Sequence, residues 1–430
     1  MNEVDLDLND LNAWLLDFLN FESEPNWELL KLATMEKLCE KFGHPERSCP
    51  CFHVAGSKGK GTIAANIAQI LRVAGYKTGV YGSPHVLHYT ERVGTGEDPF
   101  AMEVYDQAFA ELKSGVEELL LDGELKHDDV SWFELSTMFA MLCFRIAKVD
   151  YAIYEVGLGG RLDATNVVVP ECCAFGAIEL EHTEFLGDTL TAVASEKAGI
   201  LKPGVPAVSI AQKPEVEKVL QKRAEELGVK IEFLPRIDNY ERADAEVAMV
   251  TVKCVLPDLD VELADEAIKH ARLPGRFELL GDEDLPDKFK QIPYVLLDVA
   301  HTPNSVKCVT ERMQREKLHG KLLFGCVKDK RVEEMAQILA QSGLFSEVYL
   351  TRPGDFKKSD LAMMQEVFNE AFALGYAGTE IKVDEEFGRM IDLVMHEAAE
   401  QKEPVIVLGS FYLVAEVKKY LLKQGRGDER

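Results

Sequence analysis

The chain has 430 residues and a formal net charge of −26, and 47% of its residues are hydrophobic. This length and composition are typical of a two-domain globular protein. The negative charge disfavours a nucleic-acid partner, because a phosphate backbone requires a basic surface, but a few local basic side chains can still bind a small anion such as ATP. No apolar run is long enough to cross a membrane, and the acidic N-terminus lacks the basic segment of a signal peptide. Nine scattered cysteines favour free thiols in a reducing cytoplasm over a metal site. We expect a monomer with no membrane or nucleic-acid partner.

The first 83 residues predict two helices followed by a βαβ unit. Residues 9–42 read as two amphipathic helices, interrupted near residues 20–26. An apolar run at 51–55 predicts a buried strand, a glycine-rich loop follows it, and helical periodicity then leads to a second strand at 77–83. This order of elements predicts an α/β fold with a parallel sheet.

The loop after the first strand reads GSKGKGT. Its glycines allow backbone N–H groups to converge on an anion at a helix N-terminus. Lys60 is expected to reach the outer phosphates of a nucleotide, and Thr62 to place a hydroxyl on Mg²⁺. The spacing differs from the common P-loop by the extra Gly61, and a plain glycine-rich turn is the alternative. The residues expected to cradle the phosphates are Gly56, Ser57, Lys58, Gly59, Lys60, Gly61 and Thr62.

Further strands and helices complete the first domain, with a mostly apolar helix at 130–149 and strands predicted at 150–160, 172–180 and 206–210. Glu155 lies at the carboxyl end of a predicted strand, where open α/β sheets bind ligands, and a carboxylate there suits Mg²⁺. A helix cap or a surface ion pair is the alternative.

Two further residues of the first domain have ordinary explanations when each is taken alone. His182 follows an apolar strand, where a histidine is more often structural than functional. Lys197 lies on a helix, where a lysine is usually solvated. Neither position by itself predicts a site.

A second α/β domain is predicted after the turn at 274–275, so we divide the chain into residues 1–272 and 273–430. Strand and helix patterns alternate again from residue 294 onward, as in a smaller doubly wound fold. Asp298 and His301 follow its first strand, in a ligand-facing position. The next strand ends at three charged residues for which a solvated loop is equally plausible, namely Lys328, Asp329 and Lys330.

Several segments together resemble one family, in family order from about residue 53 to residue 417. They are GSKGKGT, SPH, EVGLGGRLDATN, EHTEFLGDTL, SEKAGILKPGVP, LPGRFE, LLDVAHTP, FGCVKDK and GSFYLVAEV. The chain resembles the folylpolyglutamate synthases and bifunctional dihydrofolate/folylpolyglutamate synthases, which are Mur-ligase-like ATP-dependent amide ligases. The resemblance implies a P-loop-containing ATPase domain followed by a Rossmann-like glutamate ligase domain.

The resemblance also implies roles for individual residues. Thr62, Ser83 and Glu155 match positions that hold the Mg²⁺ of bound ATP. Glu155, His182 and Lys197 match a second Mg²⁺ site, in which the lysine is carbamylated and becomes an oxygen ligand. The residues matched to the nucleotide or to the glutamate side of the site in the second domain are Arg276, Asp298 and His301. Lys60, Glu155, His182 and Lys197 are the residues that the resemblance makes catalytic.

The reaction implied by the resemblance joins L-glutamate to a folate carboxylate through an acyl phosphate, with ATP as the phosphoryl donor. Addition of the first glutamate to dihydropteroate is a second activity that the sequence leaves open. One alternative is a Mur-type ligase that acts on a cell-wall precursor, and another is a nucleotide-binding regulator that hydrolyses ATP slowly. A dinucleotide-dependent oxidoreductase is disfavoured because no G-x-G-x-x-G opens a helix after the strand that ends in GLGG.

Overall fold

The computed structural model describes residues 7–19, 31–328, 331–354, 359–375 and 379–425. The interruption predicted at residues 20–26, and both Asp329 and Lys330, lie outside these ranges. The chain divides into two compact units, Met1–Ala271 and Arg272–Arg430. Each is an α/β structure with a mostly parallel sheet, which confirms the predicted fold class.

The first unit contains a seven-stranded sheet in the order β3-β2-β4-β1-β5-β6-β7, in which only the edge pair β2–β3 is antiparallel. Its strands are β1 (Cys51–Ala55), β2 (Thr78–Tyr81), β3 (Val93–Gly94), β4 (Tyr151–Glu155), β5 (Cys172–Phe175), β6 (Ala207–Ser209) and β7 (Ile231–Phe233). Its helices are α1 (Asn9–Leu15), α2 (Leu32–Lys41), α3 (Lys60–Val73), α4 (Met102–Leu121), α5 (Trp132–Ala147), α6 (Thr183–Leu186), α7 (Leu190–Ala198), α8 (Pro214–Leu227), α9 (Tyr240–Val255) and α10 (Val261–Ile268).

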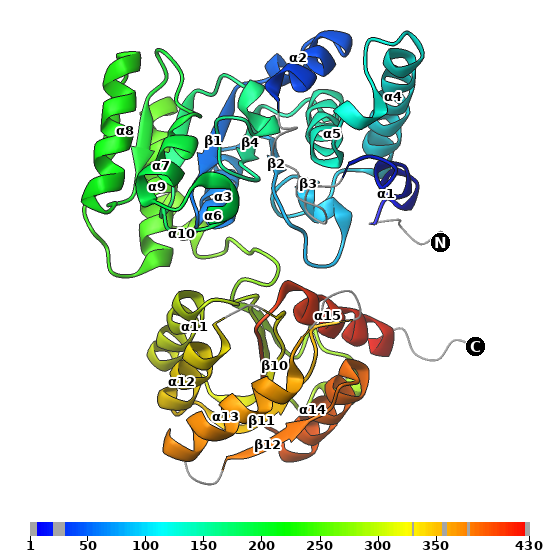
Figure 1. The fold of residues 1–430 in the computed structure, drawn as a ribbon, viewed down its shortest axis with the longest axis vertical. Helices are drawn as coiled ribbons and strands as arrows, with labels where there is room; N and C mark the ends of the chain where they lie inside the picture. Colours follow the sequence, from blue (N-terminus) through cyan, green and yellow to red (C-terminus); the bar gives the residue numbers. More distant parts are fainter. Residues whose placement is uncertain (1–6, 20–30, 329–330, 355–358, 376–378, 426–430) are drawn as a thin grey trace. The chain divides into compact units, whose positions relative to one another are not determined.

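Helices cover both faces of this first sheet (Figure 1). Helices α3, α9 and α10 pack their apolar side chains on one face of the central strands, and α7 and α8 pack on the other. A separate core surrounds α5, whose buried side chains extend over 13 of its 16 residues. That burial explains why its sequence is apolar on all sides rather than on one stripe.

The second unit contains a six-stranded sheet in the order β12-β11-β10-β13-β9-β8, with β8 antiparallel at its edge. Its strands are β8 (Glu278–Leu280), β9 (Val295–Leu297), β10 (Gly320–Phe324), β11 (Phe345–Leu350), β12 (Glu380–Val383) and β13 (Val405–Leu408). Its helices are α11 (Pro303–Glu316), α12 (Val332–Ser342), α13 (Leu361–Gly375), α14 (Phe387–Gln401) and α15 (Phe411–Gly425). Figure 1 shows α11, α12 and α13 on one side of this sheet and α14 and α15 on the other.

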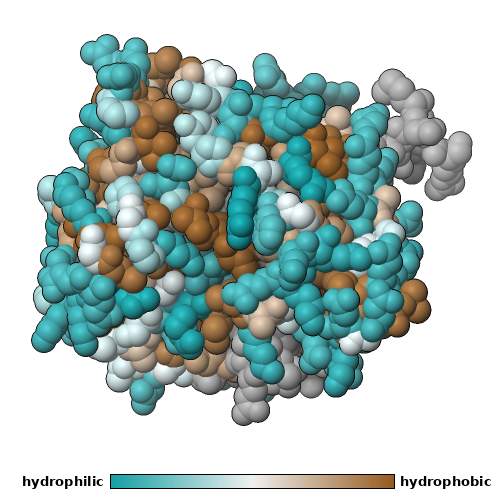
Figure 2. Space-filling view, turned by 90° about the horizontal axis from the view of Figure 1, so that it is seen from above, coloured by the Kyte–Doolittle hydropathy of each residue, from teal (hydrophilic) through white to brown (hydrophobic). Residues whose placement is uncertain are grey.

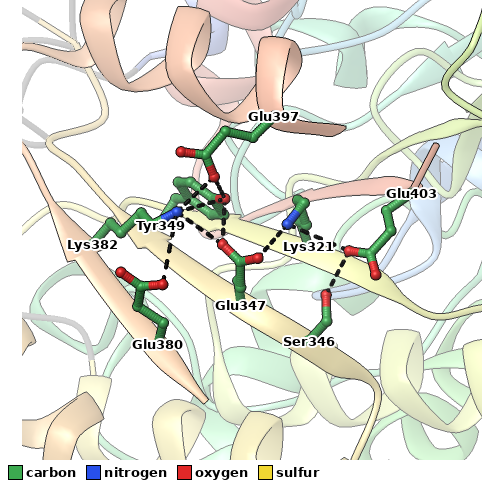
Figure 3. Close-up of polar contacts among 8 residues, drawn as sticks. All are labelled: Lys321, Ser346, Glu347, Tyr349, Glu380, Lys382, Glu397 and Glu403. Atoms are coloured by element: carbon green, nitrogen blue, oxygen red, sulfur yellow. Dashed lines mark hydrogen bonds and ion pairs between the residues drawn. The ribbon is translucent and has the colours of Figure 1, made fainter. Parts of the chain in front are cut away.

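A polar network joins the strands of the second sheet to α14 (Figure 3). Lys321 of β10 is fully buried, and its Nζ lies 2.6 Å from Glu347 Oε1 and 3.4 Å from Glu403 Oε2. The second oxygen of Glu347 contacts Lys382 Nζ at 2.9 Å, and Lys382 also pairs with Glu397 of α14 at 2.6 Å. The network therefore connects three neighbouring strands and one covering helix through charged side chains.

The surface is polar, as the composition leads one to expect. On the face seen in Figure 2, hydrophilic residues predominate and hydrophobic residues form patches between them. Within the part of the chain that the structure describes, no helix combines the length and the apolar character that a membrane crossing requires.

Candidate active site

Three strands of the first unit place the predicted site residues at one edge of the sheet. Strands β1 and β4 are parallel neighbours with Val54 opposite Glu155, and β2 lies on the other side of β4. The carboxyl ends of parallel strands share one edge, so the loop after β1, Glu155 and Ser83 gather there. The structure brings two of them into contact, because the Ser83 N–H donates to Glu155 Oε2 at 3.4 Å.

The glycine-rich loop is anchored by hydrogen bonds to the segment that follows β5. The N–H groups of Ser57 and Lys58 donate to the Ala177 carbonyl at 2.7 and 3.0 Å, and Ser57 Oγ donates to the Glu179 carbonyl at 2.9 Å. Gly59 then precedes α3 with a φ of +82°, a conformation that side chains disfavour. The N–H groups of the first turn of α3 have no intrahelical acceptor, so this turn is suited to bind an anion.

Two lysines converge on one carbonyl of this loop. Lys60 Nζ donates to the Gly56 carbonyl at 3.1 Å, and Lys197 Nζ donates to the same oxygen at 3.0 Å. Lys197 also pairs with Glu181 Oε1 at 2.7 Å and is only 1% exposed. The expectation that Lys197 is solvated is therefore wrong, because α7 packs this side chain beneath the loop.

Burial changes the proton affinity of this lysine. It lowers the pKa of Lys197 to about 8, Lys60 acts in the same direction, and Glu181 opposes both. For Glu181, burial raises the pKa, but the two lysines outweigh it and keep the pKa of this carboxyl below its usual range. Lys197 is thus a lysine that can lose its proton at moderately alkaline pH.

The predicted metal ligands are partly assembled. Glu155 is 9% exposed at the end of β4, and its carboxylate lies within reach of Ser83. Carboxylate and hydroxyl oxygens from Glu155, Ser83 and Thr62 have the chemistry that Mg²⁺ prefers, with phosphate and water oxygens completing the shell. Within the described ranges, no three His, Cys, Asp or Glu side chains form a cluster that could hold a metal by themselves. The residue types fit a Mg²⁺ ion that arrives with a nucleotide.

His182 lies in the segment between β5 and α6. It is exposed, its φ of 44° is left-handed, and it precedes the short helix α6. The strand predicted to run to residue 180 ends at Phe175, so His182 is on a loop and not at a strand end. Its neighbour Glu181 is the residue through which this loop contacts Lys197.

The second unit has its own cluster of predicted site residues. Asp298 follows β9, is 8% exposed, and accepts hydrogen bonds from Phe277 N at 2.7 Å and Ala300 N at 2.8 Å. Burial raises the pKa of Asp298, although Arg276 and these N–H groups oppose it. The Arg276 guanidinium lies 4.9 Å from the ring centre of Phe411, and the His301 ring lies 6.1 Å from the same ring. Arg276 and His301 therefore flank one aromatic side chain.

Sequence reasoning missed Asp244 of α9. This carboxyl is 8% exposed, and burial together with Glu241 raises its pKa to about 7. It lies directly against the phosphate loop, because a Cβ added to Gly59 would meet Asp244 Oδ1 at 2.4 Å. The sequence does indicate that this carboxyl is buried, because Asp244 lies on the apolar stripe of its helix, next to Ala243 and three residues before Val247.

Comparisons with known proteins assign the chain to a family. The profile of the family described as Mur ligase, glutamate ligase domain matches residues 275–411. The dihydrofolate synthase/folylpolyglutamate synthase of Escherichia coli K12 is 33% identical over 307 residues, which cover 65% of this chain and 68% of the relative. The chain belongs to the dihydrofolate synthase/folylpolyglutamate synthase family. The family member of Bacillus subtilis is 28% identical over 96% of this chain and 98% of its own length.

Solved structures of family members share the fold. The Escherichia coli FolC protein in complex with DHPP and ADP matches with a TM-score of 0.75 and 26% identity, covering 96% of this chain and 98% of that one. The Mycobacterium tuberculosis folylpolyglutamate synthase, in complexes with ADP and AMPPCP, matches with a TM-score of 0.79 and 22% identity over 96% and 98% of the two chains. The predicted resemblance to the dihydrofolate synthase/folylpolyglutamate synthase family is therefore confirmed.

Proposed function

We propose that this protein is an ATP-dependent ligase that adds L-glutamate to the γ-carboxylate of a folate. The observation that carries the proposal is the pair of lysines, Lys60 and Lys197, that meet at the Gly56 carbonyl of a phosphate-type loop. Membership of the dihydrofolate synthase/folylpolyglutamate synthase family, and the nucleotide complexes of its relatives, support the same substrates.

The chemistry proceeds in two steps. A carboxylate is a poor acyl donor, so the γ-phosphoryl group of ATP is first transferred to it, which forms an acyl phosphate and releases ADP. The glutamate amine then forms the amide bond, and phosphate leaves with the C–O bond electrons. Phosphoryl transfer depends mainly on positioning and charge stabilisation. The first turn of α3 and Lys60 supply both by binding the phosphates of ATP.

Divalent cations complete the proposed site. Thr62, Ser83 and Glu155 would hold the cation that accompanies ATP, and a second would be held by Glu155, His182 and Lys197. Bound Mg²⁺ supplies charge neutralisation to the transferring phosphoryl group.

Lys197 can serve as a metal ligand only after its charge is reversed. We propose that its neutral amine adds to CO₂ and loses a proton, which gives a carbamate with two oxygen donors. The lowered pKa of Lys197 supports this step, because it increases the neutral fraction of the amine near neutral pH. Glu181 fixes the Nζ position before the reaction through its 2.7 Å contact.

The second unit supplies the remaining proposed binding residues. Arg276 presents a guanidinium beside Phe411, and Asp298 fixes the backbone next to Arg276 through Phe277 N. We propose that Arg276 and Asp298 take part in nucleotide binding and that His301 belongs to the glutamate side of the site.

A two-substrate assay tests this proposal. The purified protein is supplied with ATP, Mg²⁺ and L-glutamate, together with either dihydropteroate or a reduced folate, and the products are weighed by mass spectrometry. Addition to folate alone defines a polyglutamate synthase, and addition to both substrates defines a bifunctional enzyme. Addition to neither overturns the proposal.

A further inference from the structure

The last turn of α7 is held by the segment that follows β4. This segment, residues 157–166, has the sequence GLGGRLDATN and begins shortly after Glu155, the last residue of β4. Its backbone lies directly against α7, because a Cβ added to Gly160 would meet the Glu196 carbonyl oxygen at 2.8 Å and Lys197 Cα at 3.1 Å. The 157–166 segment therefore touches the helical turn that carries Lys197.

The segment also caps this helix. The last carbonyl groups of an α-helix have no partner within the helix and are satisfied by groups outside it. The Arg161 N–H donates to the Glu196 carbonyl at 2.8 Å, and Asn166 Nδ2 donates to the Gly199 carbonyl at 3.1 Å. One of these bonds lies before Lys197 in the chain and the other after it, so together they fix the turn between them.

The side chains of Arg161 and Asn166 strengthen this contact in different ways. The exposed Arg161 guanidinium donates through Nε and Nη2 to Glu196 Oε1, at 3.1 and 3.0 Å. Asn166 is 5% exposed, and its Nδ2 also donates to the Arg161 carbonyl at 3.0 Å. Its backbone carbonyl accepts from Lys202 Nζ at 2.8 Å. Asn166 thus joins the segment both to the end of α7 and to the chain beyond it.

A second set of hydrogen bonds fixes the segment to the sheet. The Asp163 carboxylate accepts from Leu158 N at 2.9 Å and from Thr165 N at 3.0 Å. Thr165 Oγ1 lies 2.8 Å from Nε2 of His53, a buried residue of β1. A continuous path of contacts therefore runs from β1 and the end of β4, through the segment, to the last turn of α7.

We propose that the 157–166 segment holds Lys197 in a fixed position relative to Glu155. Asn166 is the main positioning residue because its hydrogen bonds are buried, and Arg161 is a weaker one because its ion pair is exposed. The consequence for catalysis rests on the proposed function, in which Glu155 and Lys197 hold one cation together. The position of Lys197 can be tested without that function.

Labelling of lysine amines tests the position without any substrate. The full-length protein is treated with a trace of acetic anhydride in CO₂-free buffer, which keeps Lys197 as the amine, and acetylated lysines are located by tandem mass spectrometry. A lysine that is 1% exposed reacts only when its surroundings open locally. We expect acetylation of Lys197 to be about tenfold faster in Asn166→Ala than in wild type, because two buried hydrogen bonds are lost. In Arg161→Ala we expect a rise of about twofold, which Arg161→Lys should reverse.

Two controls separate positioning from a general loss of stability. Cys143 is fully buried in α5 of the same unit, so its alkylation by iodoacetamide reports opening of that unit and should not change in Asn166→Ala. Arg389→Ala breaks an ion pair of the same length as that of Arg161, from Arg389 Nη2 to Asp384 Oδ1 at 3.0 Å, and should leave Lys197 unchanged. Equal rises at Cys143 and Lys197, or no rise at Lys197 in Asn166→Ala, would overturn the proposal.

A kinetic measurement tests the consequence for catalysis. We expect Asn166→Ala to lower kcat and to raise the Mg²⁺ concentration for half-maximal rate by about tenfold each, because groups that orient a metal ligand affect metal affinity by about 10- to 100-fold. KM for ATP should change little, since the phosphate loop is anchored at Ala177. Faster labelling of Lys197 with an unchanged Mg²⁺ requirement would support the positioning and overturn the proposed metal role of Lys197. A wild-type protein without ligase activity would overturn the proposed function, and the labelling rates would still decide the positioning.

Discussion

Among the residues that the structure describes, each unit buries one lysine almost completely, and the two lysines have opposite surroundings. Lys197 in the first unit has one carboxylate partner and a second lysine nearby. Lys321 in the second unit contacts two carboxylates, Glu347 and Glu403, within a network that holds still more (Figure 3). Around Lys197, burial prevails and lowers its pKa to about 8. Around Lys321, burial by itself raises the pKa of Glu347, but hydrogen bonds from Lys321, Tyr349 and Lys382 outweigh it and bring the value to about 2.

The difference shows how the neighbouring carboxylates decide what a buried lysine can do. The same residue type can hold elements of the fold together in one place and be proposed for chemistry in another. In the second unit, hydrogen bonds from Lys321, Tyr349 and Lys382 keep the Glu347 carboxylate ionised, and the ion pair of Lys382 with Glu397 ties the strands to a helix. A shortage of carboxylates leaves a lysine whose charged form is costly, so its neutral amine becomes accessible. The carbamate that we propose for Lys197 depends on this shortage of carboxylates, because only a neutral amine adds to CO₂.

The largest expected effect on activity comes from replacing the buried Lys197. Lys197→Met should lower the rate of glutamate addition by about 100- to 1000-fold, because a group that stabilises transition-state charge is worth about 3–4 kcal/mol. The change also leaves the Glu181 carboxylate without its lysine partner, so the free energy of unfolding should fall as well, and the rate is therefore expressed per folded molecule. Product formation by mass spectrometry and urea unfolding measure the two quantities. Full activity in this variant would contradict the proposed role.

The matched change in the second unit should affect stability instead. Lys321→Met leaves Glu347 and Glu403 without their shared partner, so we expect the free energy of unfolding to fall by about 3 kcal/mol. Activity per folded molecule should stay within about twofold of wild type. Adding Glu347→Gln should restore part of the loss, as a double-mutant cycle would report. A loss below about 0.5 kcal/mol would mean that the network adds nothing to stability.

Acid should remove the contribution of Glu347 to the free energy of unfolding. The folded-state pKa of Glu347 is about 2 against an ordinary 4.5, so its contribution is fully present above pH 4.5 and is lost as the pH falls toward 2. The contribution is about 3 kcal/mol for a shift of this size. Urea unfolding of wild type and Glu347→Gln between pH 6 and pH 3 measures it. The stability difference between the two proteins should shrink steadily below pH 4.5, and a difference that does not depend on pH would rule out this linkage.

The smallest expected effect on stability comes from a substitution at Gly59, in the glycine-rich loop that carries Lys60. Gly59→Ala places a methyl group 2.4 Å from Asp244 Oδ1 at a φ of +82°, which we expect to cost about 2 kcal/mol and to raise KM for ATP. Gly204 has a similar φ of +79° with nothing within 4 Å, so Gly204→Ala reports the backbone cost alone. Equal effects of the two changes on stability and on KM would show that the contact with Asp244 is unimportant.

Local sequence patterns predicted most of the elements that carry the site. The strand predicted at 51–55 is β1, and Glu155 ends β4 as expected. The helix expected after the glycine-rich loop is α3, which begins at Lys60 directly after Gly59 in a left-handed conformation. Local sequence patterns do not reveal β12, because this strand has no fully buried residue and lacks the apolar run that marks a central strand.

The sequence by itself determined the α/β class, the phosphate-type loop and the family resemblance, because these depend on short motifs and on periodicities along the chain. Only the tertiary structure decided that Lys197 is buried against Gly56 and that Asp244 lies on Gly59. Each of these contacts joins residues far apart in the chain. Their geometry follows from how helices pack on the sheet, and a lysine or an aspartate has the same local pattern whether it faces solvent or a partner.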